Sequence, residues 1–334
     1  MKKSYYLFNP GRLSRKDNTL KFTPIDENGR EGTPKYIPVE AVNNLYVYGS
    51  LDANSALYNF LGKQQINVHF FDYYEHYTGS FQPKDYLQAG ALLTRQVAHY
   101  ADKKKRLAIA ASLVEGASFN MVKNLKYYQN RGRILETIME EIAELCDHLP
   151  GITAVDELMG IEGNIRMRYY DAFGEIMPDF EWEKRTRQPP ANELNALVSF
   201  GNMMCYTLAL DQIYHTQLHP TISYLHEPGV RRFSLALDIA EIFKPLLVDR
   251  TIFRVVNKKE IQKNDFDRRT KFITLKEAGR KKFIRAWEER LGETIQHRNL
   301  KKKVSYKHLV KLECYKLVKH LMDITPYQPF KAWW

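Results

Sequence analysis

The sequence predicts an α+β fold of two domains, a small N-terminal β-strand domain at residues 1–83 and a larger all-helical domain at residues 84–334. The length of 334 residues suffices for two domains at about 100–200 residues each. Short β-rich runs separated by turn residues fill the first part, and from about Tyr86 onward hydrophobic residues recur with helical spacing. A composition of 44% hydrophobic and 27% charged residues is typical of a globular protein with a buried core.

The N-terminal part is rich in β-branched and aromatic residues between turn signals. Strands are expected at 4–8, 19–22, 44–48 and 66–71. A short helix is expected to open at 50–54 and to run to Gly62. The segment 79–83 contains Gly and Pro and is expected to be a linker.

The second part shows long amphipathic stretches. Helices are expected at 86–115, 118–130, 133–149, from about 153 to 173, from 193 to about 219, from 234 to 243, and in the basic remainder to about 322. Asn192 follows two prolines and is expected to cap the helix that begins after it.

Charge is distributed unevenly along the chain. The formal net charge is +11 with a pI near 9.3, and residues 250–334 hold 23 Lys and Arg against 9 Asp and Glu. One interpretation is a solvated tail without a partner. We favour a positive surface that binds the phosphates of a nucleic acid and releases their counterions.

Three cysteines without CxxC spacing exclude a disulfide framework and a zinc ribbon, and they indicate a reducing compartment. The opening residues lack the apolar segment of a signal peptide, and the longest uncharged run, 194–210, is shorter than the roughly 20 residues that span a bilayer. We therefore expect a cytoplasmic protein.

One candidate for chemistry is Glu162, which lies between Gly160 and Gly163 within a helical pattern. Each glycine costs about 1 kcal/mol relative to alanine inside a helix, so the pair requires a reason. Close approach of another helix or of a ligand backbone would supply one. The alternative is a helix crossing with Glu162 on the surface.

His226, Asp238 and Glu241 form the second group of candidates. Asp238 and Glu241 are three residues apart and therefore share one face of a mostly apolar helix. The alternatives are a solvated His226 and acids that form salt bridges with nearby Lys or Arg. The residues after Glu227 do not complete an HExxH motif, which excludes a zinc peptidase.

Two carboxylates and one imidazole would form a site for Mg²⁺ or Mn²⁺, and beside a basic surface the natural substrate is a phosphodiester. A rival site consists of Asp211, His215 and His219, which are spaced by four residues and could hold zinc on one helical stripe. No third strong ligand stands near that histidine pair in the sequence.

Several segments together resemble the CRISPR-associated adaptation endonuclease and integrase, the "Cas one" family, in a form similar to its subtype I-B branch. The resembling segments are 6–20, which looks like the family's opening strands, 160–166 with the glutamate motif, 185–197, 225–226 with the histidine, and 234–245 with the acidic helix. Each segment is weakly specific alone, but all of them in this order are strongly specific.

The resemblance implies an N-terminal β-sandwich, a helical catalytic domain and a homodimer formed through the β domain. It implies a catalytic set of Glu162, His226, Asp238 and Glu241, in which Glu162, His226 and Glu241 ligate Mg²⁺ or Mn²⁺ and Asp238 supports the metal or the DNA. Two departures exist. Glu241 stands where the family often carries Asp, and Asn202 replaces a tyrosine that often follows 199–201.

The implied reaction belongs to CRISPR antiviral defence. The 3′-hydroxyl of captured double-stranded DNA attacks a phosphodiester at the repeat boundary of the array, in a transesterification that needs no ATP. The implied partner is the small "Cas two" protein, which forms a hetero-hexamer with two dimers. Residues beside the motifs that we expect to contact phosphates are Arg166, Arg185, Arg187, Arg231, Arg232 and Lys244. The alternatives are a stand-alone nuclease acting on branched DNA in repair and a non-catalytic DNA-binding scaffold.

Overall fold

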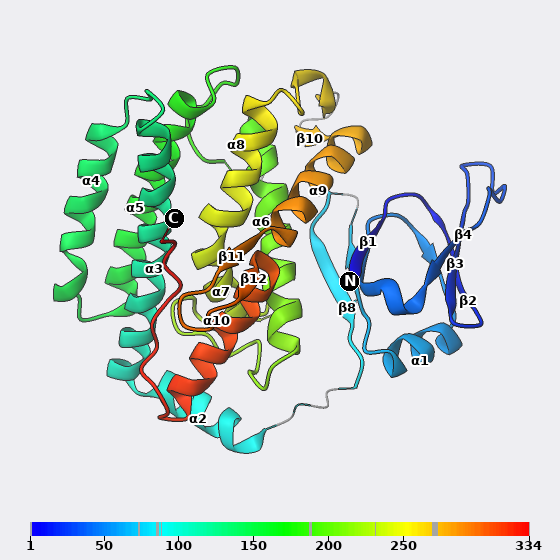
Figure 1. The fold of residues 1–334 in the computed structure, drawn as a ribbon, viewed down its shortest axis with the longest axis horizontal. Helices are drawn as coiled ribbons and strands as arrows, with labels where there is room; N and C mark the ends of the chain where they lie inside the picture. Colours follow the sequence, from blue (N-terminus) through cyan, green and yellow to red (C-terminus); the bar gives the residue numbers. More distant parts are fainter. Residues whose placement is uncertain are drawn as a thin grey trace. The chain divides into compact units, whose positions relative to one another are not determined.

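The computed structural model describes residues 2–72, 74–84, 87, 89–186, 189–230, 232–268 and 273–333. The chain divides into two compact units, Met1–Tyr86 and Leu87–Trp334 (Figure 1). The N-terminal unit holds the main sheets and the C-terminal unit is mostly helical. This arrangement confirms the predicted α+β fold class.

Two four-stranded sheets form the N-terminal unit. The first has the order β1 (Lys3–Leu7), β5 (Val42–Val47), β7 (Asn67–Phe71) and β8 (Tyr77–Phe81), with β1, β5 and β7 parallel and β8 antiparallel to β7. The second has the order β4 (Lys35–Pro38), β3 (Thr19–Pro24), β2 (Gly11–Lys16) and β6 (Leu51–Asp52). A 3₁₀ turn, η1 (Val39–Ala41), precedes β5.

Both sheets and helix α1 (Ser55–Lys63) contribute to one hydrophobic core. Leu13 and Leu20 come from the second sheet, Leu45 and Val68 from the first, and Leu61 from α1. Each of these side chains is nearly inaccessible to solvent. The shared core explains why the two sheets are stable together.

Two local predictions in this unit were wrong. The first three residues of segment 79–83 do not form a linker. Gly79 to Phe81 belong to β8 and pair with β7, with His69 opposite Ser80. The short helix does not open at 50–54, because Leu51 and Asp52 form β6 and the side chain of Asn54 caps α1 by accepting from Leu57 N. Long-range strand pairing overrides the local turn signals in both cases.

The C-terminal unit contains helices in an order close to the prediction. They are α2 (Gly90–Ala101), α3 (Lys103–Gln129), α4 (Glu136–Asp147), η2 (Leu149–Gly151), α5 (Val155–Ile176), α6 (Glu193–Tyr214), α7 (Ser234–Lys244), the π turn η3 (Pro245–Asp249), α8 (Arg250–Asn257), η4 (Lys263–Asp265), α9 (Glu277–Gly292) and α10 (Tyr306–Leu321). Two two-stranded sheets, β9 (Phe266–Asp267) with β10 (Thr274–Leu275) and β11 (Thr294–Gln296) with β12 (Lys303–Ser305), correct the expectation of an all-helical domain.

Helix α3 is continuous where the sequence predicted two helices. The break lies earlier, at Asp102, whose side chain accepts from the backbone nitrogens of Lys104 and Lys105. Gly116 stays within α3 because Pro329 packs against it, and a Cβ there would lie 2.6 Å from the Cβ of Pro329. The C-terminal segment thus runs back along α3, as Figure 1 shows.

Helices α6 and α7 of the C-terminal unit pack against each other, and α7 also packs against α3. Along α6 nearly every side chain is buried, in agreement with its uncharged sequence. Even so, no helix among the described residues is long and apolar enough to cross a membrane. Asp238 and Glu241 of α7 are buried, so these acids require compensating neighbours.

We predict that Gly201→Ala lowers the free energy of unfolding of the C-terminal unit by about 1–3 kcal/mol, because the new methyl group collides with buried Val248 and lies 3.2 Å from Phe283. Urea unfolding followed by tryptophan fluorescence measures this, since all four tryptophans lie in that unit. Gly160→Ala is the control. Its methyl group meets no atom within 4 Å, so it should stabilise by up to about 1 kcal/mol. Equal stability of the two variants would contradict the prediction.

Candidate active site

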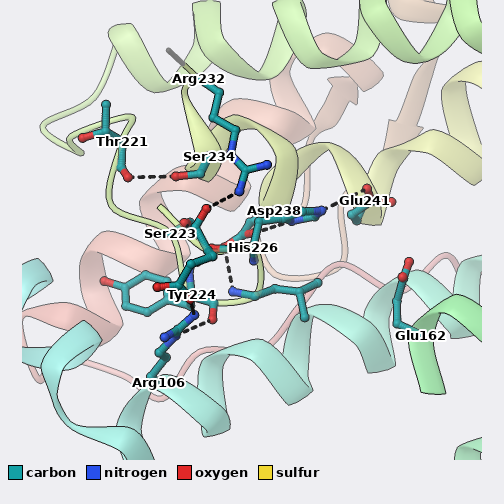
Figure 2. A network of polar contacts seen from close by, with 12 residues as sticks. Arg106, Glu162, Thr221, Ser223, Tyr224, His226, Arg232, Ser234, Asp238 and Glu241 are labelled. Carbon is teal, nitrogen blue, oxygen red and sulfur yellow. Dashed lines mark hydrogen bonds and ion pairs between the residues drawn. The ribbon is translucent and has the colours of Figure 1, made fainter. Parts of the chain in front are cut away.

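Three segments of the C-terminal unit converge on one polar cluster. Helix α5 carries Glu162 and Arg166 one turn apart, and α7 carries Asp238 and Glu241 on one face. The loop between α6 and α7 carries His226. Figure 2 shows His226, Asp238 and Glu241 side by side, with the carboxylate of Glu162 directed toward them from a separate helix.

Asp238 organises the loop that carries His226. Its side chain is fully buried, and its two oxygens accept from the backbone nitrogens of Tyr224 at 2.7 Å, Leu225 at 3.1 Å and His226 at 3.0 Å. The same carboxylate lies 2.9 Å from Nδ1 of His226. Because a carboxylate only accepts, Nδ1 carries the proton and Nε2 keeps its lone pair. That Nε2 lies 4.0 Å from Oε1 of Glu241.

A second set of contacts fixes the same loop from α2 and α3. Arg106 donates through Nε to the carbonyl of Tyr224 at 3.0 Å (Figure 2). Its Nη2 donates to Glu227 at 2.6 Å. Tyr100 donates to the other oxygen of Glu227 at 2.6 Å. These hydrogen bonds lower the pKa of Glu227 and keep its carboxylate charged. Arg106 and Glu227 were not singled out in the sequence, where both look like ordinary surface charges.

Arg166 joins the two glutamates. Its Nη2 lies 2.5 Å from Oε1 of Glu162 and also contacts Oε2 of Glu241. Lys244 lies 2.5 Å from the other oxygen of Glu241. Only 18% of the Glu162 side chain and 7% of the Glu241 side chain are exposed, so both carboxylates depend on these cations.

The electrostatics of the cluster favour charged glutamate. Burial by itself raises the pKa of Glu241, but the charges of Arg166 and Lys244 outweigh burial and lower it to about 2. The pKa of Asp249, the last residue of η3, moves the other way. Burial raises it to about 7, and a hydrogen bond with Tyr169 lowers it only in part. Asp249 was missed in the sequence, although a single acid after the apolar run 245–248 was a usable signal.

The donor atoms near Arg166 are those that a hard divalent cation selects: two carboxylates and an imidazole nitrogen with a fixed tautomer. Within the described part of the chain, no group of three or more His, Cys, Asp or Glu side chains has a metal-binding arrangement. In this arrangement the positive charges facing the carboxylates are Arg166 and Lys244. A divalent ion would therefore replace part of their contacts.

The other arginines that the sequence predicted to contact phosphates do not all lie at the carboxylate cluster. Arg185 donates to Asn195 Oδ1 and to Ser199 Oγ, both at 3.0 Å, and so holds the start of α6. Arg232 donates to the carbonyl of Glu227. Arg187 and Arg231 lie outside the described residues. Among the expected phosphate contacts that the structure describes, Arg166 and Lys244 are the two that touch the carboxylate cluster.

The rival zinc stripe does not form. Helix α6 ends at Tyr214, so His219 does not continue the stripe of Asp211 and His215. Asp211 lies 3.7 Å from His215, whereas His219 contacts Thr221. Of the explanations considered for the glycines that flank Glu162, close approach of another helix is not seen, because a Cβ at Gly160 or Gly163 would meet no described atom within 4 Å. The surface beside Glu162 is open.

Comparisons with known proteins agree with this cluster of motifs. A family model described as CRISPR associated protein Cas1 matches residues 5–289. The chain belongs to the CRISPR-associated Cas1 family. A curated relative from Fusobacterium nucleatum, named CRISPR-associated endonuclease Cas1, is 46% identical over 335 residues, which cover 100% of this chain and 98% of the relative.

Solved structures give the same assignment for the fold. A CAS1 protein from Thermotoga maritima matches with a TM-score of 0.85 at 39% identity, covering 99% of this chain and 100% of that one. A casposase bound to integration product also reaches a TM-score of 0.85, at 19% identity and with 99% and 94% coverage. The resemblance to the Cas1 family inferred from the sequence motifs is thereby confirmed.

For this Cas1 protein, we predict that Asp238→Asn lowers the free energy of unfolding by about 3 kcal/mol, because the new amide NH₂ faces backbone N–H donors. Nitrogen NMR of His226 should show a larger fraction of the Nε2–H tautomer. Asp171→Asn, at an exposed ion pair with Arg168, is the control and should change stability by at most about 0.5 kcal/mol. An unchanged tautomer in Asp238→Asn would refute the positioning role.

Proposed function

We propose that this Cas1 family member is a metal-dependent DNA endonuclease and integrase of CRISPR adaptation, which inserts new spacer DNA at the repeat boundary. The observation that carries the proposal is the meeting of Glu162 and Glu241 at Arg166, with Nε2 of His226 at 4.0 Å from Glu241. The Fusobacterium relative is named an endonuclease, which is consistent with this chemistry. The fold is also shared with a casposase bound to integration product.

Glu162, His226 and Glu241 would hold Mg²⁺ or Mn²⁺. When bound, such an ion polarises a phosphoryl oxygen and lowers the pKa of an attacking hydroxyl. Asp238 contributes by holding the proton on Nδ1 of His226, so that the lone pair of Nε2 would be available to ligate the ion. Arg106 and Tyr100 contribute by holding Glu227 and thereby the loop.

The proposed reaction exchanges one phosphodiester for another. The 3′-oxygen of the captured DNA forms a bond to phosphorus, the existing bond from phosphorus to the 3′-oxygen of the repeat strand breaks, and that oxygen takes up a proton. Negative charge accumulates on the phosphoryl oxygens during the exchange. Arg166 and Lys244 lie at the carboxylate cluster and would stabilise that charge. Water in place of the hydroxyl gives hydrolysis by the same route.

We infer that the active complex forms in the cytoplasm. It contains double-stranded DNA, a second copy of this chain and a small Cas2 partner. Solved complexes named Cas6-RT-Cas1--Cas2 contain a chain with this fold, at a TM-score of 0.80 and 18% identity. The charge of residues 250–334, with 23 basic and 9 acidic side chains, suits a polyanionic partner. The dimer would form through the β domain.

The deciding experiment incubates the protein, with and without a Cas2 partner, with a spacer-length DNA duplex and a supercoiled plasmid that carries a repeat array. We expect covalent joining at the repeat boundary in Mg²⁺ or Mn²⁺ and none in EDTA. Glu162→Gln and His226→Ala should lose at least about 100-fold in rate while they retain DNA binding. Glu157→Gln, an exposed acid on the same helix α5, is the control.

The alternatives give different outcomes in that experiment. Cutting of branched DNA without joining to the plasmid would indicate a repair nuclease, and DNA binding without any product would indicate a scaffold. Full activity of either variant would show that the site lies elsewhere.

We predict that Arg166→Ala lowers the thermal stability in EDTA by the equivalent of about 3 kcal/mol, because Glu162 and Glu241 lose their shared cation. Mn²⁺ should restore more stability in this variant than in the wild type, and the gain should vanish in Glu162→Gln/Arg166→Ala. Scanning fluorimetry measures both effects.

Arg168→Ala is the control for Arg166→Ala, because Arg168 lies on the same helix and forms exposed ion pairs with Glu141 and Asp171. It should change stability by at most about 1 kcal/mol, with no dependence on Mn²⁺. An equal Mn²⁺ response in the two arginine variants would show that the carboxylates do not hold the ion.

A further inference from the structure

A second concentration of positive charge lies away from the carboxylate cluster. It surrounds a cavity of about 410 Å³ lined by Lys123, Lys126, Tyr127, Asn130, Arg250 and Arg290. These residues come from α3, from the start of α8 and from the end of α9. The lining that the structure describes contains no acid. We call this cavity the α3–α9 pocket.

The arginines of the α3–α9 pocket are fixed by aromatic rings and by one carbonyl. Arg250 lies over the ring of Tyr127 at 4.4 Å, and Arg290 lies over the ring of Tyr306 at 3.9 Å. Arg290 also donates to the carbonyl of Leu246 at 3.0 Å. Both guanidiniums are thus held in place before any ligand arrives.

The positive charge in the pocket is only partly compensated. Lys123, Lys126 and Arg250 form no ion pair with any residue that the structure describes, and only Arg290 meets an acid, Glu293. Buried nitrogens, Nε of Arg250 and Nη2 of Arg290, have no hydrogen-bond partner among the described residues. Burial, and then the neighbouring charge of Arg290, lower the pKa of Arg250. An anion bound in the pocket would compensate the positive charge that these residues leave unpaired.

The chemistry of the pocket selects phosphate. Guanidinium groups bind phosphate oxygens through paired N–H donors, and lysines at the rim add charge without demanding a geometry. A cavity of about 410 Å³ is larger than one phosphate requires and suits a nucleotide unit of a strand. The exposed side chains Lys126 and Asn130 lie at the rim, where a continuous strand would enter and leave.

The pocket is linked to the carboxylate site through buried polar groups. Asn124, between Lys123 and Lys126 on α3, donates to Tyr169 at 2.9 Å and to the carbonyl of Pro245 at 2.7 Å. Tyr169 hydrogen-bonds with Asp249, which directly precedes Arg250. The same buried groups therefore support both sites from within.

We propose that the α3–α9 pocket binds the phosphate backbone of DNA at a distance from the reacting phosphodiester. The proposal rests on DNA being the substrate of the carboxylate site. Its role is to hold a strand in place, and it takes no part in breaking bonds.

The test measures DNA affinity without catalysis. Fluorescence anisotropy of a labelled duplex is recorded in EDTA over a series of salt concentrations. We expect Lys123→Glu/Lys126→Glu to weaken binding by at least about tenfold near 0.1 M salt and to reduce the slope of log K against log salt by about 2. Lys123→Gln/Lys126→Gln should show the same trend with a smaller change, and it avoids acids near a helix C-terminus.

Lys103→Glu/Lys104→Glu is the matched control. It makes the same charge change on exposed positions of α3, roughly 30 Å away along the helix. Thermal melts verify that all variants fold. The proposed role of the pocket in DNA binding would be overturned by an equal loss of affinity in the control, or by no loss in the Lys123/Lys126 variants. The proposed integrase function would stand in both cases.

Two further outcomes separate the sources of phosphate. Stabilisation of the wild type by pyrophosphate at constant ionic strength, together with unchanged DNA affinity in the variants, would assign the pocket to a free phosphate compound and overturn the DNA proposal. Failure of the wild type to bind any DNA would overturn the proposed function and this inference with it.

Discussion

The site depends on one buried carboxylate. Asp238 gathers three consecutive backbone N–H groups and Nδ1 of His226, and its complete burial makes each of these charge-assisted hydrogen bonds difficult to replace. The loop that carries His226 lacks regular structure, so its conformation comes from this carboxylate on one side and from Arg106 on the other. The helix α7 thereby determines the position and the tautomer of an imidazole that lies outside it.

Charge compensation is the second constraint. Glu162 and Glu241 come from different helices, and each would be costly in the interior without a cation. Arg166 contacts both, and Lys244 contacts Glu241. The depressed pKa of Glu241 keeps this carboxylate ionised throughout the physiological range. The cluster is therefore neutralised by its own side chains, and under the proposed function a divalent ion would replace part of these contacts.

Helix α3 connects the functional regions. Near its start Arg106 holds the His226 loop, in its middle Asn120 binds the returning C-terminal segment at Phe330, and Asn124 binds the carbonyl of Pro245 beneath the π turn. Lys126, one turn further along, lies at the rim of the α3–α9 pocket. A single helix of this length can support the carboxylate site and the proposed DNA pocket together, since it packs against α7, which carries Glu241, and against η3, which leads into Arg250.

The sequence by itself determined the fold class, the family and the residues of the carboxylate cluster, because hydrophobic period and motif order are local properties that survive in a linear chain. It did not determine β8, the uninterrupted α3 or the two small sheets of the C-terminal unit, since strand pairing and the packing of Pro329 on Gly116 join residues distant along the chain. The roles within the site were also decided by tertiary structure. Arg166 was expected at a phosphate and lies between two carboxylates, Asp238 anchors a loop, and Arg250 and Arg290 meet across a cavity, because only folding brings their charges within reach of one another.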